Sequence, residues 1–277
     1  MYTAYTITAP PELHDILVAM LAEVGFDSFE QREAEVVAYA ERTNRTEALQ
    51  SLREVIGSYG LSYNTMDLED KNWNEEWERA FTPIRVDDRL LIRATFHATE
   101  PGIPLELVID PKMSFGTGHH ATTYMMCEFV LAYFAAGPSG PVRLLDYGCG
   151  TGILAIVAKL LGASTVDAVD IESWAVENSA ENARLNNVTL DRLILGTLPD
   201  ILGGKPYDVV LANINRNVLL ESAATLNRHI RPGGRAYLSG ILMQDEGLVV
   251  EHYRQAGFRH LRSVAREDWR AFEFIRE

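Results

Sequence analysis

Apolar residues recur at helical spacing between extended segments in the first 68 residues, and this order predicts a small mixed domain. Leu13, Leu17 and Leu21 share one helical face, Pro11 suits the start of that helix and Gly25 its end. The pattern predicts strands at 2–8, 26–30, 36–40 and 61–68, and helices at 11–24 and 46–59. Strand, helix, two strands, helix and strand is the order of a ferredoxin-like α+β domain, which we expect over residues 1–68.

Helical and strand-like segments alternate through the second half of the chain. Strands are expected at 143–146, 165–170, 192–195, 208–212, 235–239, 259–264 and 271–275, and helices at 120–135, 152–161, 174–186, 217–229 and 244–256. Because such alternation builds a parallel sheet between helices, we expect an α/β fold with a seven-stranded, mostly parallel Rossmann-like sheet that ends in an antiparallel hairpin. This domain spans 84–277, including a β-rich lead-in at 84–96 and 105–109.

Residues 69–83 are predicted to form a linker between the two domains. The segment is polar and acidic and carries Trp73 and Trp77, four residues apart. Two indoles at that spacing share one helical face. That face either docks against a neighbouring domain or contacts a substrate, and the sequence leaves both interpretations open.

Composition places the chain among ordinary globular proteins. It has 277 residues, of which 47% are hydrophobic and 23% charged. No apolar run approaches the roughly 20 residues of a membrane span, and the start has neither the basic nor the apolar region of a secretory signal. Cys127 and Cys149 are too few for a disulfide framework and are expected to be reduced thiols. We therefore expect a cytoplasmic protein that does not associate with membranes.

The formal net charge of −14 bears on partners. It repels phosphate backbones, and the sequence has no cluster of Lys and Arg that would make a local exception, so direct binding of nucleic acid is not expected. The same charge attracts a basic partner. A monomer is favoured.

A glycine-rich turn joins the predicted strand at 143–146 to the next helix. Residues 144–152 read Leu-Leu-Asp-Tyr-Gly-Cys-Gly-Thr-Gly. A ligand can approach the backbone closely at such glycines, and doubly wound sheets bind nucleotides beyond the carboxyl ends of their strands. Asp170 ends the next strand, at the spacing of roughly 20 residues at which an acid meets ribose hydroxyls.

Two features of this turn favour S-adenosylmethionine over a dinucleotide. The dinucleotide pattern needs a third glycine at position 153, where the chain has Ile153. Asp146 would also face a pyrophosphate unfavourably, whereas it can pair with the ammonium of a methionine group. The residues predicted to bind this cofactor are Asp146, Gly148, Gly150, Gly152 and Asp170. The alternative is a structural turn that only packs a helix on a strand.

A second glycine-containing loop, residues 110–120, precedes the predicted helix at 120–135. The free N–H groups at that helix start and the hydroxyl of Thr123 can bind a carboxylate, for which the methionine carboxylate of the cofactor is the candidate. Phe115 either covers the cofactor or fills the core. His119 and His120 have no third ligand at a recognisable spacing, so no metal site is expected, and a helix cap or a contact in the substrate channel is the favoured role.

Asn213 follows the predicted strand at 208–212 and therefore lies at the nucleotide-binding edge of the sheet. Its amide can accept a hydrogen bond from an amine and aim the amine lone pair at a methyl group, so Asn213 is predicted to be catalytic and to contact the cofactor. The alternative is that Asn213 caps the following helix, although Asn215 is the better-placed cap.

These motifs together resemble the bacterial ribosomal protein L-eleven methyltransferase family over essentially the whole chain. The turn at 146–152 alone is typical of class I methyltransferases. The resemblance includes the connector with Trp73 and Trp77. The Phe-Gly-Thr-Gly loop at 115–118 with the threonines that follow it, combined with the Asn-Ile pair at 213–214, is more specific.

The resemblance implies a class I methyltransferase fold and transfer of several methyl groups from S-adenosylmethionine to a ribosomal protein. The acceptors would be its N-terminal α-amine and lysine ε-amines, with the N-terminal domain holding this substrate. By the family pattern, the contacts to the cofactor or the reacting centre would come from Thr123, Gly148, Asp170 and Asn213. The alternatives are a methyltransferase for another protein or a small amine, and a cofactor-binding regulatory module without turnover.

Overall fold

The computed structural model describes residues 2–26, 28–41, 45–57, 59–67, 82–110, 118–201 and 204–277. The chain divides into two compact units, Met1–Phe81 and Thr82–Glu277. Most of the predicted linker and Phe115 lie outside the described residues. Within the described part, no helix combines the length and apolar character that a membrane crossing requires.

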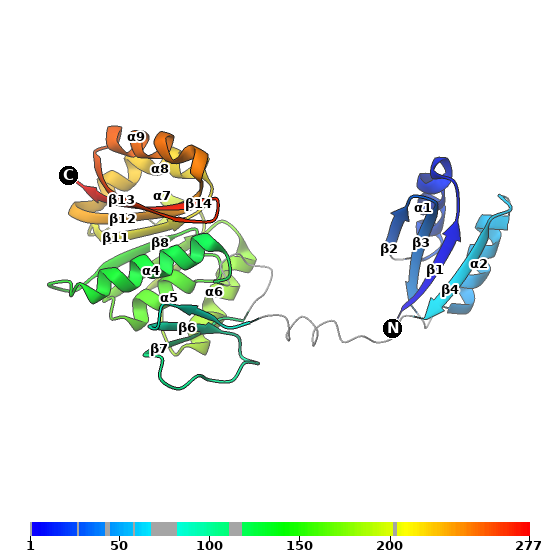
Figure 1. The fold of residues 1–277 in the computed structure, drawn as a ribbon, viewed down its shortest axis with the longest axis horizontal. Helices are drawn as coiled ribbons and strands as arrows, with labels where there is room; N and C mark the ends of the chain where they lie inside the picture. The colour runs from blue at the N-terminus through cyan, green and yellow to red at the C-terminus, as the bar shows by residue number, and fades with distance from the viewer. Residues whose placement is uncertain are drawn as a thin grey trace. The chain divides into compact units, whose positions relative to one another are not determined.

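The N-terminal unit is a four-stranded sheet with two helices (Figure 1). Its elements are β1 (Tyr2–Thr8), the 3-10 turn η1 (Pro11–Leu13), α1 (His14–Glu23), β2 (Ser28–Arg32), β3 (Glu35–Glu41), α2 (Arg45–Gly57) and β4 (Ser62–Asp67). The sheet order is β2-β3-β1-β4 and each neighbouring pair is antiparallel. Since β3 lies between β1 and β2, this is the split arrangement of a ferredoxin-like domain, as the sequence predicts.

The core of this unit explains why its two helices form where they do. Leu17 and Leu21 lie four residues apart on α1, Leu52 and Ile56 lie four apart on α2, and all four pack into one cluster with strand residues such as Tyr5. Residues at this spacing share a helical face, so each helix buries a single apolar stripe.

The second unit is built on a seven-stranded sheet with the order β10-β9-β8-β11-β12-β14-β13. The strands are β8 (Arg143–Tyr147), β9 (Thr165–Asp170), β10 (Arg192–Leu195), β11 (Tyr207–Asn213), β12 (Ile230–Leu242), β13 (Phe258–Arg266) and β14 (Trp269–Arg276). Neighbours from β10 to β12 are parallel, and β14 runs antiparallel to both β12 and β13. The predicted fold class, including the terminal hairpin, is confirmed.

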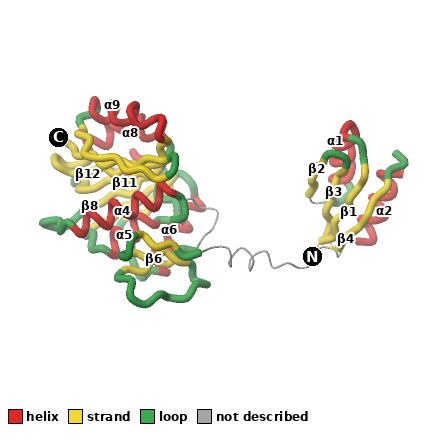
Figure 2. Tube along the Cα trace, viewed as in Figure 1, coloured by secondary structure: helices red, strands yellow, loops and turns green. Residues whose placement is uncertain are grey.

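Helices cover both faces of this sheet (Figures 1 and 2). They are α4 (Ala121–Ala135), α5 (Ile153–Leu160), α6 (Ser173–Leu185), α7 (Leu198–Ile201), α8 (Arg216–His229) and α9 (Glu246–Gln255), with the 3-10 turn η3 (Met243–Asp245) before α9. Leu144 belongs to the cluster of α4 and α5, whereas its neighbour Leu145 belongs to the cluster of α8 and α9. Alternate strand residues thus bury against opposite layers.

The topology determines where a ligand can bind. From β8 the chain proceeds to β9 and β10 on one side and then returns to β11 on the other side of β8. At such a reversal the loops diverge and leave a crevice beyond the carboxyl ends of the strands. The crevice of this domain therefore lies where β8 and β11 end, next to the glycine turn.

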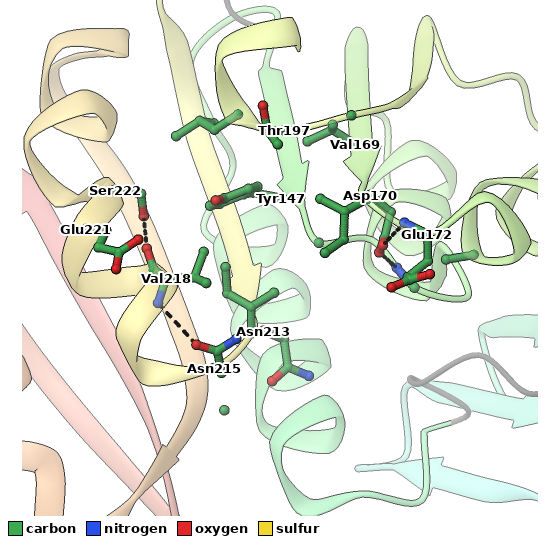
Figure 3. A pocket seen from close by; sticks show the side chains of 18 of the residues that line it. Tyr147, Val169, Asp170, Glu172, Thr197, Asn213, Asn215, Val218, Glu221 and Ser222 are labelled. Carbon is green, nitrogen blue, oxygen red and sulfur yellow. Dashed lines mark hydrogen bonds between the residues drawn. The ribbon is translucent and has the colours of Figure 1, made fainter.

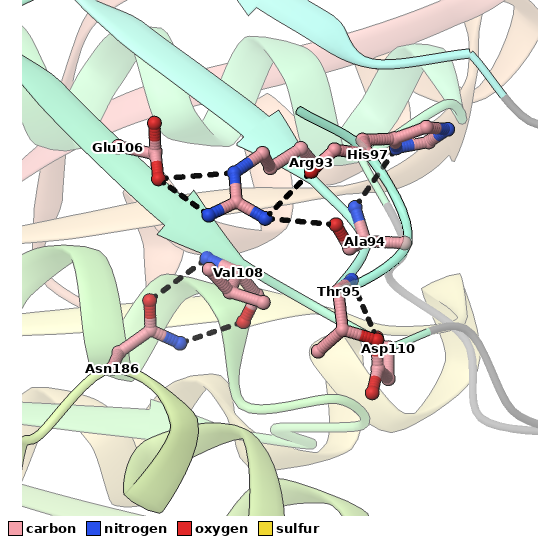
Figure 4. Close-up of polar contacts among 8 residues, drawn as sticks. All are labelled: Arg93, Ala94, Thr95, His97, Glu106, Val108, Asp110 and Asn186. Atoms are coloured by element: carbon pink, nitrogen blue, oxygen red, sulfur yellow. Dashed lines mark hydrogen bonds and ion pairs between the residues drawn. The ribbon is translucent and has the colours of Figure 1, made fainter. Parts of the chain in front are cut away.

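The β-rich lead-in forms a separate three-stranded sheet of β5 (Ile84–Val86), β6 (Leu90–Arg93) and β7 (Leu105–Val108). Asn186 anchors it by accepting a hydrogen bond from the Val108 amide at 2.8 Å and donating one to the Val108 carbonyl at 2.6 Å (Figure 4). The Arg93 guanidinium pairs with the Glu106 carboxylate at 2.7 Å. These contacts hold the end of β7, from which the chain continues toward the loop at 110–120.

Candidate active site

A pocket of about 920 Å³ opens at the carboxyl ends of β8, β9 and β11. Side chains and backbone from these strands line it together with parts of α7, α8, β12 and the β13–β14 hairpin. Figure 3 shows Tyr147, Asp170 and Asn213 pointing into the same region from three different strands. The pocket therefore occupies the crevice that the topology creates.

The glycine turn forms one end of the pocket, which we call the donor end. Gly148 has a φ of +76°, and a Cβ built there would lie 2.2 Å from Cγ2 of Ile214. The amide of Gly148 donates a hydrogen bond to the Val169 carbonyl at 2.9 Å. A side chain at this position would collide with Ile214, so glycine is required where β8 turns beside the pocket.

Asp170 is fixed by two backbone amides at the donor end. One carboxylate oxygen accepts a hydrogen bond from the Gly150 amide at 2.8 Å, and the other accepts one from the Glu172 amide at 3.1 Å (Figure 3). These bonds orient the carboxylate while the side chain still lines the pocket. Asp170, Gly148 and Gly150 are thus brought together, as the sequence predicts, and their contacts to the cofactor stay predictions.

Gly152 lies behind this surface and is not a lining residue of the pocket. It has a φ of +76° and precedes the first residue of α5. A Cβ there would lie 2.9 Å from Oγ of Ser179, which itself donates a hydrogen bond to the Gly150 carbonyl. Gly152 therefore allows α6 to pack closely against the turn. Its predicted contact to the cofactor is not tested by these distances.

Asp146 also lies behind the turn and is 1% exposed. Its Oδ2 accepts a hydrogen bond from the Ala155 amide at 3.0 Å, and its Oδ1 has no partner among the described residues. Burial raises the pKa of this carboxyl to about 7. Asp146 is not a lining residue of the pocket, so its pairing with an ammonium group stays a prediction.

Asn213 lies at the end of β11, next to the glycine turn, in the part of the pocket that we call the acceptor end. Its Nδ2 donates a hydrogen bond to Oγ1 of Thr123 at 3.3 Å, and its buried Oδ1 has no partner in the described part of the chain. The cap of α8 is Asn215, whose side chain accepts a hydrogen bond from the Val218 amide at 3.1 Å. The hydrogen bond to Thr123 holds the Asn213 amide, and Oδ1 of Asn213 can accept a hydrogen bond from a ligand.

Two aromatic rings complete the acceptor end. His120 is the N-cap of α4, since its side chain accepts a hydrogen bond from the Thr122 amide. Its ring centre lies 4.8 Å from that of Trp269, the first residue of β14. Both line the pocket together with Gly240, where a Cβ would lie 2.3 Å from the Ile214 carbonyl oxygen.

Trp269 and Gly240 line the pocket although neither is among the residues predicted from the sequence. Gly240 directly follows the strand expected at 235–239, and a glycine in that position indicates a close approach of another backbone segment. The sequence gives no such indication for Trp269, because only the antiparallel return of β14 brings it beside β12. His120 was expected to be a helix cap or a contact in the substrate channel, and it is both the N-cap of α4 and a lining residue of the pocket. Across the described residues, no group of three or more His, Cys, Asp or Glu could hold a metal ion.

The charge of the pocket favours a cation. Among the described residues that line the pocket there are three acidic side chains and no Lys or Arg. The acidic side chains are those of Asp170, Glu172 and Glu221. Acidic groups beside a partly enclosed site attract positive charge more strongly than they would in open water. A sulfonium and an ammonium on one ligand match this lining.

The family follows from comparison with known proteins. The family model described as "Ribosomal protein L11 methyltransferase (PrmA)" matches residues 14–277. The chain belongs to this family. A ribosomal protein L11 methyltransferase from Porphyromonas gingivalis is 41% identical over 265 residues, covering 94% of this chain and 90% of the relative. One from Phocaeicola vulgatus is 37% identical over 283 residues and covers 99% of each chain.

A solved structure supports the same assignment. The ribosomal protein L11 methylase of Lactobacillus delbrueckii subsp. bulgaricus superposes with a TM-score of 0.64 at 26% identity, covering 71% of this chain and all of that one. The chain is therefore a methyltransferase, and its methyl donor is S-adenosylmethionine. The site fits this donor through the acidic lining, the glycines of the turn and the unpartnered oxygen of Asn213.

Proposed function

We propose that this methyltransferase acts on ribosomal protein L11 and transfers methyl groups to its N-terminal α-amine and lysine ε-amines. Relatives across nearly the whole chain carry this substrate in their names. The net charge of −14 supports the proposal because it speeds the encounter with a basic protein substrate.

The observation that carries the proposal is the unpartnered Oδ1 of Asn213. A primary or secondary amine has an N–H to donate and a lone pair to react with. A fixed amide oxygen that accepts this N–H fixes the direction of the lone pair, and such orientation lowers the barrier to displacement. Thr123 prevents the Asn213 amide from rotating, because its hydroxyl oxygen accepts from Nδ2.

The donor supplies an electrophilic methyl carbon: the amine nitrogen bonds to it, and the carbon–sulfur bond breaks with its electron pair left on sulfur. The residues predicted to hold the donor are Asp146, Gly148, Gly150, Gly152 and Asp170, with Thr123 at its carboxylate and Asn213 beside the reacting centre. Their contribution is binding and alignment. We assign no covalent step to the chain.

The acceptor amine must be neutral to react. An α-amine with a reference pKa of about 8 is partly neutral at pH 7, whereas a lysine with a pKa of about 10.4 must first lose a proton. The apolar surface of Ile214 in the pocket favours the neutral amine by limiting its hydration. The proton then leaves to water.

The proposed setting follows from the substrate. Because a ribosomal protein is made and assembled in the cytoplasm, that compartment is the proposed place of action. The proposed partner is the protein alone, with no direct contact to nucleic acid, and the proposed form is a monomer. The N-terminal unit is proposed to hold the substrate.

Intact mass spectrometry of purified ribosomal protein L11 tests this function. The protein is incubated with the enzyme and S-adenosylmethionine and is then fragmented to locate added methyl groups. Mass increments on the N-terminus or on lysines support the proposal. A methyl donor that binds in calorimetry without any increment on L11 contradicts it, and a panel of other basic proteins and small amines then separates a different acceptor from a binding module without turnover.

A further inference from the structure

We propose that Trp269 and His120 form an aromatic subsite that binds the methylated acceptor amine and so determines how many methyl groups one encounter adds. The inference rests on the proposed function and assigns roles that the cofactor chemistry alone does not. The subsite takes a mono- or dimethylammonium group, which is the product of one round and becomes the substrate of the next after it loses its proton.

Three contacts bring the two rings to the same end of the pocket as Asn213. Thr123 accepts a hydrogen bond from Nδ2 of Asn213 at 3.3 Å and belongs to the first turn of α4. His120 caps that same turn. The ring centre of His120 is 4.8 Å from that of Trp269. The α4 N-terminus thus connects the acceptor oxygen to both rings.

A second connection runs through the sheet. Asn213 pairs in register with Ser239 on β12, and the hydroxyl of Ser239 donates a hydrogen bond to the Arg270 carbonyl at 2.9 Å. Arg270 directly follows Trp269. The backbone before Trp269 is held as well, because the Met243 amide donates to the Asp268 carbonyl at 2.8 Å. Trp269 is therefore positioned by the sheet and does not depend on a bound ligand for its place.

The chemistry of the rings matches methylated amines. An indole is the strongest of the aromatic side chains in binding cations, and alkylammonium groups are bound on aromatic surfaces because they combine positive charge with apolar methyl groups. Each added methyl increases the apolar contact and lowers the cost of removing the ammonium from water. A partly methylated amine therefore binds this surface more tightly than the unmodified one.

The arginines of the β13–β14 hairpin do not compete with a ligand for the ring surfaces of Trp269 and His120. The two cations nearest in sequence have other partners: the Arg266 guanidinium lies 3.7 Å from the ring centre of Tyr124, and the Arg270 Nε donates to Glu246 at 3.0 Å. Trp269 and His120 are each only partly buried and both line the pocket. Neither arginine is a lining residue, so a cationic amine meets no like charge from them.

The test measures how many methyl groups are added in one encounter. Enzyme bound to labelled L11 is mixed with S-adenosylmethionine and an excess of unlabelled L11, and the labelled protein is analysed by intact mass. For the wild type we expect di- and trimethylated amines on the labelled protein. For Trp269→Leu we expect the ratio of trimethyl to monomethyl product to fall by about tenfold, with the first transfer changed less.

Two further variants keep the test independent of folding. His120→Asn preserves a good N-cap for α4 while it removes the ring, and Trp269→Phe keeps a weaker aromatic surface. Both are expected to reduce the ratio less than Trp269→Leu. Trp174→Leu is the matched control, because Trp174 lines the same pocket beside Glu172, to whose carboxylate its indole donates at 3.1 Å. It is expected to weaken donor binding without changing the ratio.

The outcomes separate the inference from the proposed function. If the wild type adds no methyl group to L11, the proposed function fails and the inference fails with it. If the wild type adds several methyl groups and the Trp269 and His120 variants give the same ratio, only the inference is overturned. A wild type that adds a single methyl group per amine overturns the inference and leaves the proposed function intact.

Discussion

The donor end and the acceptor end of the pocket are built in different ways. At the donor end the backbone provides much of the surface: Gly148 and Gly150 line the pocket, and two backbone amides orient the Asp170 carboxylate. At the acceptor end side chains provide it, with Asn213, His120 and Trp269 coming from β11, the cap of α4 and β14.

This difference assigns binding of the methyl donor to one end of the pocket and orientation of the acceptor amine to the other. A surface made of backbone is lost only when the backbone moves, so the donor end should be sensitive to any added Cβ. A surface made of side chains can be changed one group at a time without moving the sheet. Substitutions at the donor end should therefore change the donor Kd, and substitutions at the acceptor end should change kcat.

The largest expected effect is on the donor end. Gly148→Ala places a Cβ 2.2 Å from Cγ2 of Ile214 at a φ of +76°, so the turn must move. Such overpacking should weaken S-adenosylmethionine binding by about 100-fold in calorimetry.

Gly162→Ala provides the control for that loss. Gly162 has a φ of +99°, but its Cβ would meet no heavy atom within 4 Å. It shares the backbone strain without the collision and should change the donor Kd by less than about twofold. Equal losses in the two variants would show that general strain, and not closure of the turn, is responsible.

A smaller effect is expected from the residue that holds Asn213. Thr123→Val keeps the volume of a fully buried side chain but removes the oxygen that accepts from the Asn213 amide. Loss of one such hydrogen bond should reduce kcat by about fivefold. Thr123→Ser should restore kcat, and a Ser variant as slow as the Val variant would count against this role.

The smallest effect is a pH dependence confined to the donor end. The pKa of Asp146 is about 7 in the folded protein, above its ordinary value of 3.8, so the folded state without ligand retains a proton that the unfolded state releases. This contribution to stability is complete below pH 4 and is lost as the pH rises through 7. The Tm should therefore fall by several degrees between pH 5 and pH 8.

Asp146→Asn should remove this part of the pH dependence, because an amide does not titrate. Its Oδ1 can still accept from the Ala155 amide, so the turn is preserved. Scanning calorimetry of the two proteins from pH 5 to pH 8 measures the difference. Parallel Tm profiles would show that Asp146 does not titrate in this range.

The donor end was accessible from the sequence because its determinants are local. The strand at 143–146, the glycines that follow it and Asp170 lie within about thirty residues, and their spacing reflects a single strand-turn-helix unit and the next strand. Asn213 could be placed for the same reason, since it ends a strand of recognisable length. The two-domain fold followed from apolar periodicity in the same way.

The acceptor end was only partly accessible, because tertiary packing assembles it. Trp269 reaches the pocket through the antiparallel pairing of β14 with β12, which the sequence predicts only as a hairpin. The strand β12 runs from Ile230 to Leu242, longer than the expected 235–239, because a Pro-Gly-Gly segment that resembles a turn is included in it. Phe115 lies outside the described residues, so its proposed cover of the cofactor stays a prediction.

The separation of the two ends is tested most directly by Asn213→Ala. The donor Kd is measured by calorimetry, and methyl transfer to ribosomal protein L11 is measured in a single turnover with donor at saturation. We predict a donor Kd within about threefold of the wild type and a transfer rate that is lower by about 100-fold, because only the orientation of the amine is lost. A variant that transfers at the wild-type rate, or that loses donor binding and transfer together, would contradict the assignment of Asn213 to the acceptor.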